Sequence, residues 1–261
     1  MSTLVSGITS AAVPGSPRPV RQYSRRGVLG VWLAATAPMA VLAWVVAPAL
    51  AGSASTDRRS AVTLLAALTA GLVWQFILVL ALVGHEQRSL RWRAIRDALW
   101  LHPPTTATRR GGRLWLWILP FVVGFALIQL PGIDPSPAAG HDLGEFLGSA
   151  DGQAAFRGNW GLLALSVTCF LFNTVLGEEL LFRGLLLPRM RGVFGRADWI
   201  ANGVLFGLYH LHQPWSMPTA VLSGALGAYG TRRLRSAWIG IAAHSAQSVL
   251  FTVLLLALVL A

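Results

Sequence analysis

Three charged residues end a strongly apolar stretch, in the sequence GEELLFRGLLLP at residues 177–188. Glu179 and Arg183 are four residues apart, so a helix places them on one face with the acid first, the favourable order for an ion pair. Glu178 lies about 100° around the helix from Glu179 and about 140° from Arg183, so its own helix offers it no basic partner. Glu178 is therefore either a functional group or a protonated structural one, because an unpaired charge costs roughly 2.5–3.5 kcal/mol to insert into a membrane.

Two histidines on later apolar segments are the candidate partners of Glu178. His210 ends the sequence FGLYH, and His244 stands four residues before Ser248, on one face of the last segment. At 1.5 Å per residue, Glu178 lies ~14 Å and His210 ~16 Å from the end of its helix that is predicted to be cytoplasmic. On the last segment, His244 lies ~9 Å and Ser248 ~15 Å from the corresponding end. One carboxylate and two imidazoles in one layer can activate a water and stabilise an oxyanion, or bind a divalent metal. His212 is expected to point away from His210 and to be structural.

The elements that position these residues are predicted to be transmembrane helices. Of the 261 residues, 54% are hydrophobic, a larger apolar fraction than in ordinary soluble domains, and 12% are charged. The sequence predicts an all-α, polytopic helical bundle of about seven spans, within a range of about six to eight. We place the spans near residues 28–51, 60–84, 114–130, 158–187, 199–212, 218–230 and 237–260.

The charges predict the orientation of the bundle. All 21 basic residues are arginine, and the net charge is +11. The arginine-rich segment 85–113 is predicted to be cytoplasmic and the acidic segment 131–157 external, which places the N-terminus in the cytoplasm. The arginines cluster beside hydrophobic segments, so we expect no nucleic-acid binding. The single cysteine, Cys169, excludes a disulfide framework and a cysteine metal cluster.

Three regions are predicted along the chain. Residues 1–26, rich in Ser, Pro, Gly and Arg, are expected to form a disordered basic cytoplasmic tail. Residues 27–157 supply the N-terminal transmembrane helices with the basic loop 85–113, and residues 158–261 form the catalytic helical core. The sequence SRRGVLG and the later ALA at residues 49–51 also fit a cleaved export signal, but we expect the first span to be retained.

The motifs resemble those of a known family. EELLFR matches EExxxR, FGLYH matches FxxxH, and His244 matches the histidine of a final HxxxN/D motif, in the right order on successive apolar segments. The chain resembles the CPBP intramembrane proteases, also called the Abi or CAAX-protease family, which includes the Rce1 prenyl-protein proteases. The resemblance covers about residues 158–255.

The resemblance implies a role for each candidate residue. Glu178 would be the general base for the attacking water, His210 would assist it, and Glu179 with Arg183 would brace the helix. His244 would stabilise the oxyanion. Ser248 stands where the family has Asn or Asp; its hydroxyl donates one hydrogen bond with a shorter reach. Loss of one oxyanion donor costs roughly 100- to 1000-fold in rate, so full activity is in question.

The same resemblance leaves the mechanism open between two accounts. Family members are commonly described as metalloproteases, and Glu178, His210 and His244 could hold Zn²⁺ with an open position for water. No HExxH motif is present, and the account in which glutamate activates water requires no cofactor, so we prefer metal-independent hydrolysis. In both accounts we expect a cavity that opens between the helices toward the cytoplasm.

We therefore predict an endopeptidase that cleaves membrane-associated peptides or proteins. One alternative is an inactive membrane scaffold or regulator, which Ser248 favours. Another is a transporter that uses Glu178 and the histidines as a proton relay.

The arginine- and alanine-rich composition indicates a multi-pass protein of a bacterial plasma membrane, where prenylated CAAX substrates are not expected. The sequence predicts neither the substrate nor the oligomeric state.

Overall fold

The computed structural model describes residues 20–52, 56–130, 132–138 and 141–261. These residues are almost entirely helical, and within them there is no β-strand, only an isolated antiparallel bridge between Thr105 and Arg110. The predicted all-α fold is thus confirmed for the described part of the chain. The expected disordered tail falls mostly on residues 1–19, which lie outside the described residues.

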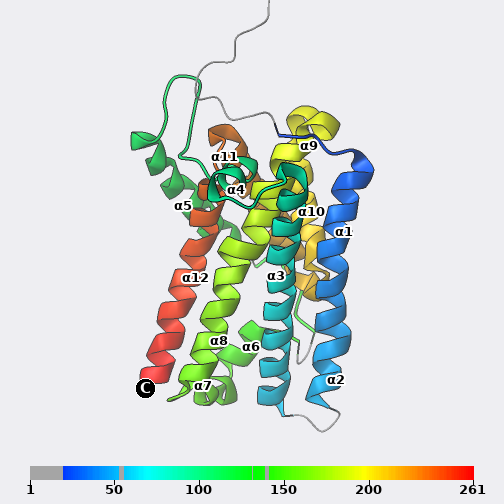
Figure 1. Cartoon of the computed structure of the whole chain (residues 1–261). Helices are drawn as coiled ribbons and strands as arrows, with labels where there is room; N and C mark the ends of the chain where they lie inside the picture. Colours follow the sequence, from blue (N-terminus) through cyan, green and yellow to red (C-terminus); the bar gives the residue numbers. More distant parts are fainter. Residues whose placement is uncertain (1–19, 53–55, 131, 139–140) are drawn as a thin grey trace, which may run out of the picture.

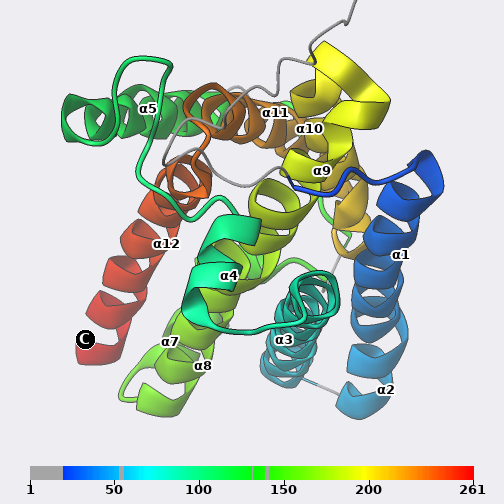
Figure 2. The same ribbon diagram turned by 45° about the horizontal axis from the view of Figure 1, so that its top comes forward.

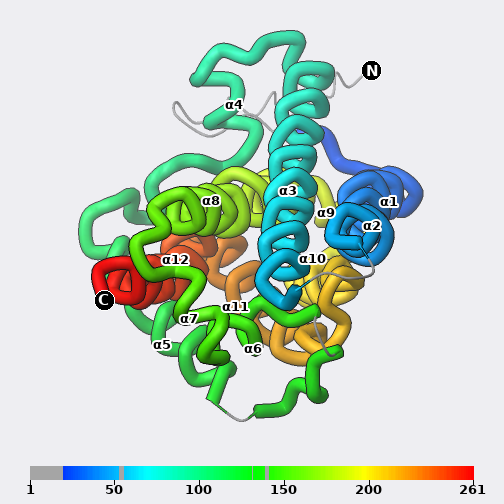
Figure 3. The backbone as a smooth tube through the Cα atoms, turned by 90° about the horizontal axis from the view of Figure 1, so that it is seen from below, coloured from blue at the N-terminus to red at the C-terminus, as the bar shows by residue number. Residues whose placement is uncertain are grey.

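Four long helical units form a row across the molecule (Figure 1). In the view from below, α3 lies between α8 and the continuous unit of α1 and α2, and α12 lies on the other side of α8 (Figure 3). The bounds are α1 Arg25–Val41, a π-helical segment η1 Leu42–Val46, α2 Ala47–Ala51, α3 Asp57–Gln87, α8 Trp160–Leu171 and α12 Ala237–Leu260. The row forms because these helices are apolar on most faces and pack on one another.

The remaining helices cover one side of this row (Figure 2). Helix α10 packs along α11 as a hairpin, and α5 lies against α11 and α12. Glycines allow the close contact between α10 and α11, because a Cβ on Gly203 would lie 2.5 Å from the backbone nitrogen of Ala225. The bounds are η2 Gly112–Trp117, α5 Ile118–Gln129, α9 Leu187–Phe194, η5 Gly195–Ala197, α10 Asp198–Tyr209, η6 His210–His212, η7 Pro214–Ser216 and α11 Met217–Leu234.

Short helices close both ends of the bundle. Helix α4, Trp92–Ala98, packs on α3 at the same end as α9, and helices α6, Leu143–Gly148, and α7, Ala150–Phe156, lie at the other end (Figure 1). The side chain of Asp142 caps α6 by accepting from the backbone N–H of Glu145 at 2.7 Å. The end that holds α4 and α9 carries the arginine-rich loops.

Five helical stretches of the described chain are long and apolar enough to cross a membrane, judged by length and composition. They are Arg25–Ala51, Asp57–Gln87, Gly112–Gln129, Trp160–His212 and Ala237–Leu260. The chain is accordingly a multi-pass membrane protein. The fourth stretch contains two of the predicted spans, and α11 is not among the five. The count of about seven spans and the cytoplasmic N-terminus stay predictions.

A buried arginine fixes the N-terminal segment to the arginine-rich end. Arg189 donates through Nη2 to Glu86 Oε2 at 2.6 Å and through Nη1 to the carbonyl of Ala98 at 3.0 Å. Tyr23 also donates to Glu86, and its backbone N–H donates to the Arg189 carbonyl at 3.0 Å. Within the region predicted to be a disordered tail, residue 23 is therefore hydrogen-bonded to α3 and α9, and helix α1 begins at Arg25.

Candidate active site

Glu178 and Glu179 lie between two π-helical segments, η3 Phe172–Gly177 and η4 Leu180–Leu186. A π-helical turn pairs residue i with residue i+5, and such turns are frequent at functional sites. Gly177 permits this backbone to approach α3 closely, because a Cβ there would lie 2.6 Å from the Phe172 carbonyl and 3.2 Å from the Leu72 carbonyl. The local distortion brings Glu178 and the residue five positions earlier, Asn173, into contact.

Glu178 is buried, with 4% of its surface exposed. With its amide nitrogen turned toward the carboxylate, Asn173 donates to Glu178 Oε1 at 3.0 Å and to Oε2 at 2.8 Å. The side chain of Tyr209 also interacts with Glu178, and the Tyr209 hydroxyl accepts from Gln75 Nε2 at 2.6 Å. Glu178 is thus held by neutral hydrogen-bond donors, and Asn173 is a site residue that the sequence analysis missed.

His210 begins the short 3-10 helix η6 at the end of α10. Its Nδ1 lies 2.8 Å from the Phe206 carbonyl, which can only accept, so Nδ1 carries the proton. In the neutral ring Nε2 is then the unprotonated nitrogen. His210 is 7% exposed, and its ring packs edge-on against Phe206, 4.9 Å between centroids. The turn therefore fixes both the position and the tautomer of this imidazole.

Glu179 joins its own helical stretch to α12 through one oxygen. Its Oε1 lies 3.1 Å from Arg183 Nη1 and 3.1 Å from His244 Nδ1. Arg183 also donates through Nη2 to the Gly224 carbonyl at 3.3 Å, and its guanidinium lies 4.2 Å from the ring centroid of Phe206. Glu179 and Arg183 are fully buried. The predicted ion pair is present, and it extends to His244, which the sequence analysis did not anticipate.

One cavity of about 290 Å³ connects the candidate residues. Its lining includes Glu178, His210, His244 and Ser248, together with Asn173 and Gln247. Helix geometry put the four candidates at similar depth, and the structure brings them to one cavity. Glu179 and Arg183 do not line the cavity, and Glu179 supports His244 by pairing with its Nδ1. The Ser248 carbonyl accepts from Thr252 Oγ1 at 2.7 Å, and no described contact occupies the Ser248 hydroxyl.

His212 also lines this cavity, contrary to the expectation that it points away from His210. The two rings stack with centroids 5.2 Å apart and planes 27° apart. The helical periodicity behind that expectation ends at Tyr209, where α10 gives way to the 3-10 helix η6. His212 is 7% exposed, and its Nδ1 has no hydrogen-bond partner among the described residues.

The cavity extends away from the arginine-rich end of the bundle. Its lining also includes Asp134, Leu143, Gln213 and Ser216, and no residue of the basic loop 85–113 lines it. Asp134 fixes this end by accepting from the backbone N–H of Thr219 at 3.0 Å. The expected opening toward the cytoplasm stays a prediction.

The donor set does not fit a resident zinc ion. Among the described residues, no three His, Cys, Asp or Glu side chains gather closely enough to hold a metal. Glu178 and the two histidines line the same cavity, but they do not form such a group. We therefore derive no step through a metal.

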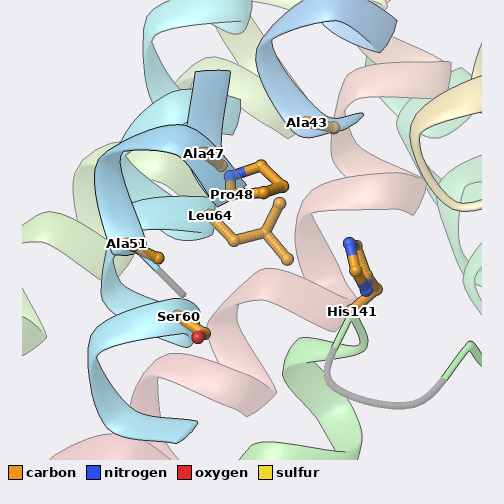
Figure 4. A pocket seen from close by; sticks show the side chains of 8 residues that line it. Ala43, Ala47, Pro48, Ala51, Ser60, Leu64 and His141 are labelled. Atoms are coloured by element: carbon orange, nitrogen blue, oxygen red, sulfur yellow. The ribbon is translucent and has the colours of Figure 1, made fainter. Parts of the chain in front are cut away.

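A separate pocket of about 120 Å³ lies beside α2 (Figure 4). It is lined mainly by small apolar side chains such as Ala43, Ala47 and Pro48, and His141 faces them. The His141 ring stacks on Trp44 with 4.7 Å between centroids. This pocket contains no carboxylate in its lining, so it does not offer the chemistry of the central cavity.

Residues 159–250 match the family model described as type II CAAX prenyl endopeptidase Rce1-like. The match contains every candidate residue, from Glu178 to Ser248, and confirms the resemblance drawn from the three motifs. This part of the chain is similar to the Rce1-like domain, and the similarity suggests an intramembrane peptidase of the CAAX-protease type. A search of the curated proteins and a search of the solved structures gave no match.

Proposed function

We propose that the chain is an intramembrane endopeptidase in which Glu178 activates a water for attack on a peptide carbonyl. The observation that carries this proposal is the shared cavity of Glu178, His210, His244 and Ser248. A carboxylate and a neutral imidazole at one cavity wall can hold and deprotonate a water between them. The Rce1-like match supports the same chemistry.

In the proposed reaction, Glu178 takes a proton from the water while the water oxygen bonds to the carbonyl carbon. His210 orients the water by accepting its other proton in a hydrogen bond at Nε2. The tetrahedral intermediate then collapses, the carbon–nitrogen bond breaks, and Glu178 returns the proton to the leaving nitrogen. The products are a new carboxylate and a new amine, so one water is consumed for each bond cleaved.

Asn173 is proposed to position the general base. Its amide nitrogen lies within hydrogen-bond distance of both oxygens of Glu178, so it fixes the rotation of the carboxylate. Hydrogen bonds to a charged group are stronger than those between neutral groups and stabilise the ionised form that a base requires. Asn173 therefore supports catalysis through Glu178 without touching the substrate.

His244 is proposed to stabilise the oxyanion in the same cavity. Its Nδ1 is paired with Glu179, so a protonated ring presents Nε2–H as the remaining donor. Ser248 stands one helical turn further along α12 and adds a hydroxyl donor to the same cavity. An inactive scaffold remains the second candidate function, because Ser248 replaces the amide or acid of the family motif.

The test is cleavage of a peptide library by the purified protein in detergent, with and without a chelator. Wild type should cleave in both conditions, and Glu178→Gln should not. Glu145→Gln is the matched control, since Glu145 is exposed on α6 outside the cavity. Loss of wild-type cleavage with the chelator would contradict the metal-independent account. If wild type is inactive on every peptide and Ser248→Asn restores cleavage, the scaffold is the better description.

A further inference from the structure

A cavity of about 500 Å³ lies at the arginine-rich end of the bundle, apart from the central cavity. Its lining includes four arginines from two segments and two threonines of a loop, and we call it the arginine cavity. These residues are Arg191, Arg232, Arg233, Arg235, Thr105 and Thr106. The fold brings these residues together, because the segments that hold Thr105, Arg191 and Arg232 are far apart in the sequence.

Two of the four arginines in the arginine cavity have no protein partner among the described residues. Arg232 Nε lies 2.6 Å from Asp198 Oδ1, and the same carboxylate interacts electrostatically with Arg191. Within the described chain, no hydrogen bond or ion pair engages the guanidinium groups of Arg233 and Arg235. Guanidinium groups form bidentate, charge-assisted hydrogen bonds with phosphate oxygens. The arginine cavity is therefore complementary to a phosphate-bearing anion.

The wall of the arginine cavity is held in place by backbone contacts. The N–H of Thr105 donates to the carbonyl of Leu234 at 2.7 Å, which docks the loop on the end of α11. The bridge between Thr105 and Arg110 closes the loop on itself. Arg235 has a left-handed backbone with φ 48°, and the chain turns there between α11 and α12. The arginines thus project from a defined turn.

The arginine cavity lies where a lipid headgroup would be expected. Tyr229, which lines it, packs edge-on against Trp199 with ring centroids 5.4 Å apart. Trp and Tyr are enriched at membrane–water interfaces, and this pair stands at the ends of α10 and α11. The neighbouring Ile200 is 46% exposed, which suits contact with acyl chains. A membrane phosphate is therefore the source that this location favours over a soluble one.

We propose that the arginine cavity binds the phosphate of an anionic lipid headgroup. The site is separate from the central cavity, so the proposal does not depend on the proposed function. Basic pockets at the ends of transmembrane helices recognise anionic lipids, and each arginine adds to the attraction. The bound headgroup would tie the ends of α9 and α11 to one leaflet of the membrane.

The test is native mass spectrometry of the purified protein with an equal mixture of phosphatidylglycerol and phosphatidylcholine. Wild type should retain phosphatidylglycerol preferentially, and the double variant Arg233→Gln/Arg235→Gln should lose about tenfold or more of that binding. The matched control is Arg91→Gln/Arg93→Gln, which removes the same charge from exposed positions of α4 and its N-terminal boundary at the same end (Figure 1). The control should bind within about twofold of wild type.

Three outcomes would overturn the proposal. Equal losses in the two double variants would show general attraction by net charge. Unchanged binding in Arg233→Gln/Arg235→Gln would place the lipid elsewhere. Wild type that retains inorganic phosphate but not phosphatidylglycerol would show a site for soluble anions. Thermal unfolding of each variant in detergent checks the fold, and the single variant Arg233→Gln replaces the double variant if the latter is unfolded.

Discussion

His244 Nδ1 lies 3.1 Å from Oε1 of Glu179, the same oxygen that faces Arg183. The two adjacent glutamates therefore have different surroundings. Glu179 is paired with a cation and an imidazole behind the cavity wall, whereas Glu178 lines the cavity and meets neutral donors. This difference predicts separate consequences for substitutions at the two positions.

Replacement of Glu179 should damage both the fold and the activity. Glu179→Gln leaves Arg183 buried without its counter-charge, which costs about 3–5 kcal/mol of unfolding free energy. It also removes the partner of His244, so peptide cleavage should fall. Thermal unfolding in detergent measures the first effect, with exposed Glu145→Gln as the control. A variant as stable as wild type would contradict the bracing role.

Replacement of Glu178 should separate activity from stability. Glu178→Gln removes a buried carboxyl group that has no cationic partner of its own, while the amide oxygen can still accept from Asn173. We expect an unfolding midpoint equal to or above that of wild type, together with loss of cleavage. A fall in the midpoint as large as that of Glu179→Gln would show that Glu178 is structural.

Gly240 should be intolerant of a side chain. A Cβ at this position would lie 2.5 Å from Glu179 Oε2 and 3.1 Å from Arg183 Cγ. Gly240→Ala should therefore cost about 1–3 kcal/mol and reduce cleavage by displacing the ion pair. Gly30→Ala is the control, because a Cβ on Gly30 meets nothing within 4 Å. Similar unfolding midpoints for the two variants would contradict the close packing around Glu179.

Asn173 should affect turnover more than substrate binding. Asn173→Ala removes the amide donor that orients Glu178, and hydrogen bonds to a charged group contribute roughly 1.5–3 kcal/mol, so kcat should fall about 10- to 100-fold. KM should change little, because the side chain acts through Glu178. Steady-state kinetics on one cleaved peptide measures kcat and KM separately. A change confined to KM would instead place Asn173 among the groups that bind substrate.

Stability should decrease in mild acid because of His102. Burial lowers the pKa of His102 below its ordinary value, with Arg96 and Arg110 acting in the same direction and Asp97 opposing them. The unfolded chain therefore binds the proton more readily, so stability is lost as pH falls below about 6.5. The unfolding midpoint should drop more between pH about 7.5 and about 5.5 in wild type than in His102→Gln. His85→Gln, at an exposed position, should keep the wild-type dependence.

The sequence predicted those parts of the site that follow from one helix at a time. The spacing of Glu179 and Arg183 predicted their ion pair, and helix depth predicted that Glu178, His210 and His244 share a layer. Lateral contacts could not be predicted from spacing within a helix, so the bond between Glu179 and His244 was missed.

Irregular backbone explains the other differences. In a regular α-helix Asn173 would lie about 140° from Glu178, but the π-helical turn aligns them. The stacking of His212 on His210 follows from the end of α10 at Tyr209. The lining of the cavity combines residues from segments far apart in the sequence, such as Asp134 and Gln213, which no local pattern specifies.

The most direct test of the central claim is a double-variant cycle on Glu178 and His210, measured as kcat/KM for one cleaved peptide. If both residues activate one water, Glu178→Gln, His210→Asn and the double variant should lose similar amounts of activity, because the second change removes nothing further. Independent losses that multiply in the double variant, or wild-type activity in Glu178→Gln, would contradict the account.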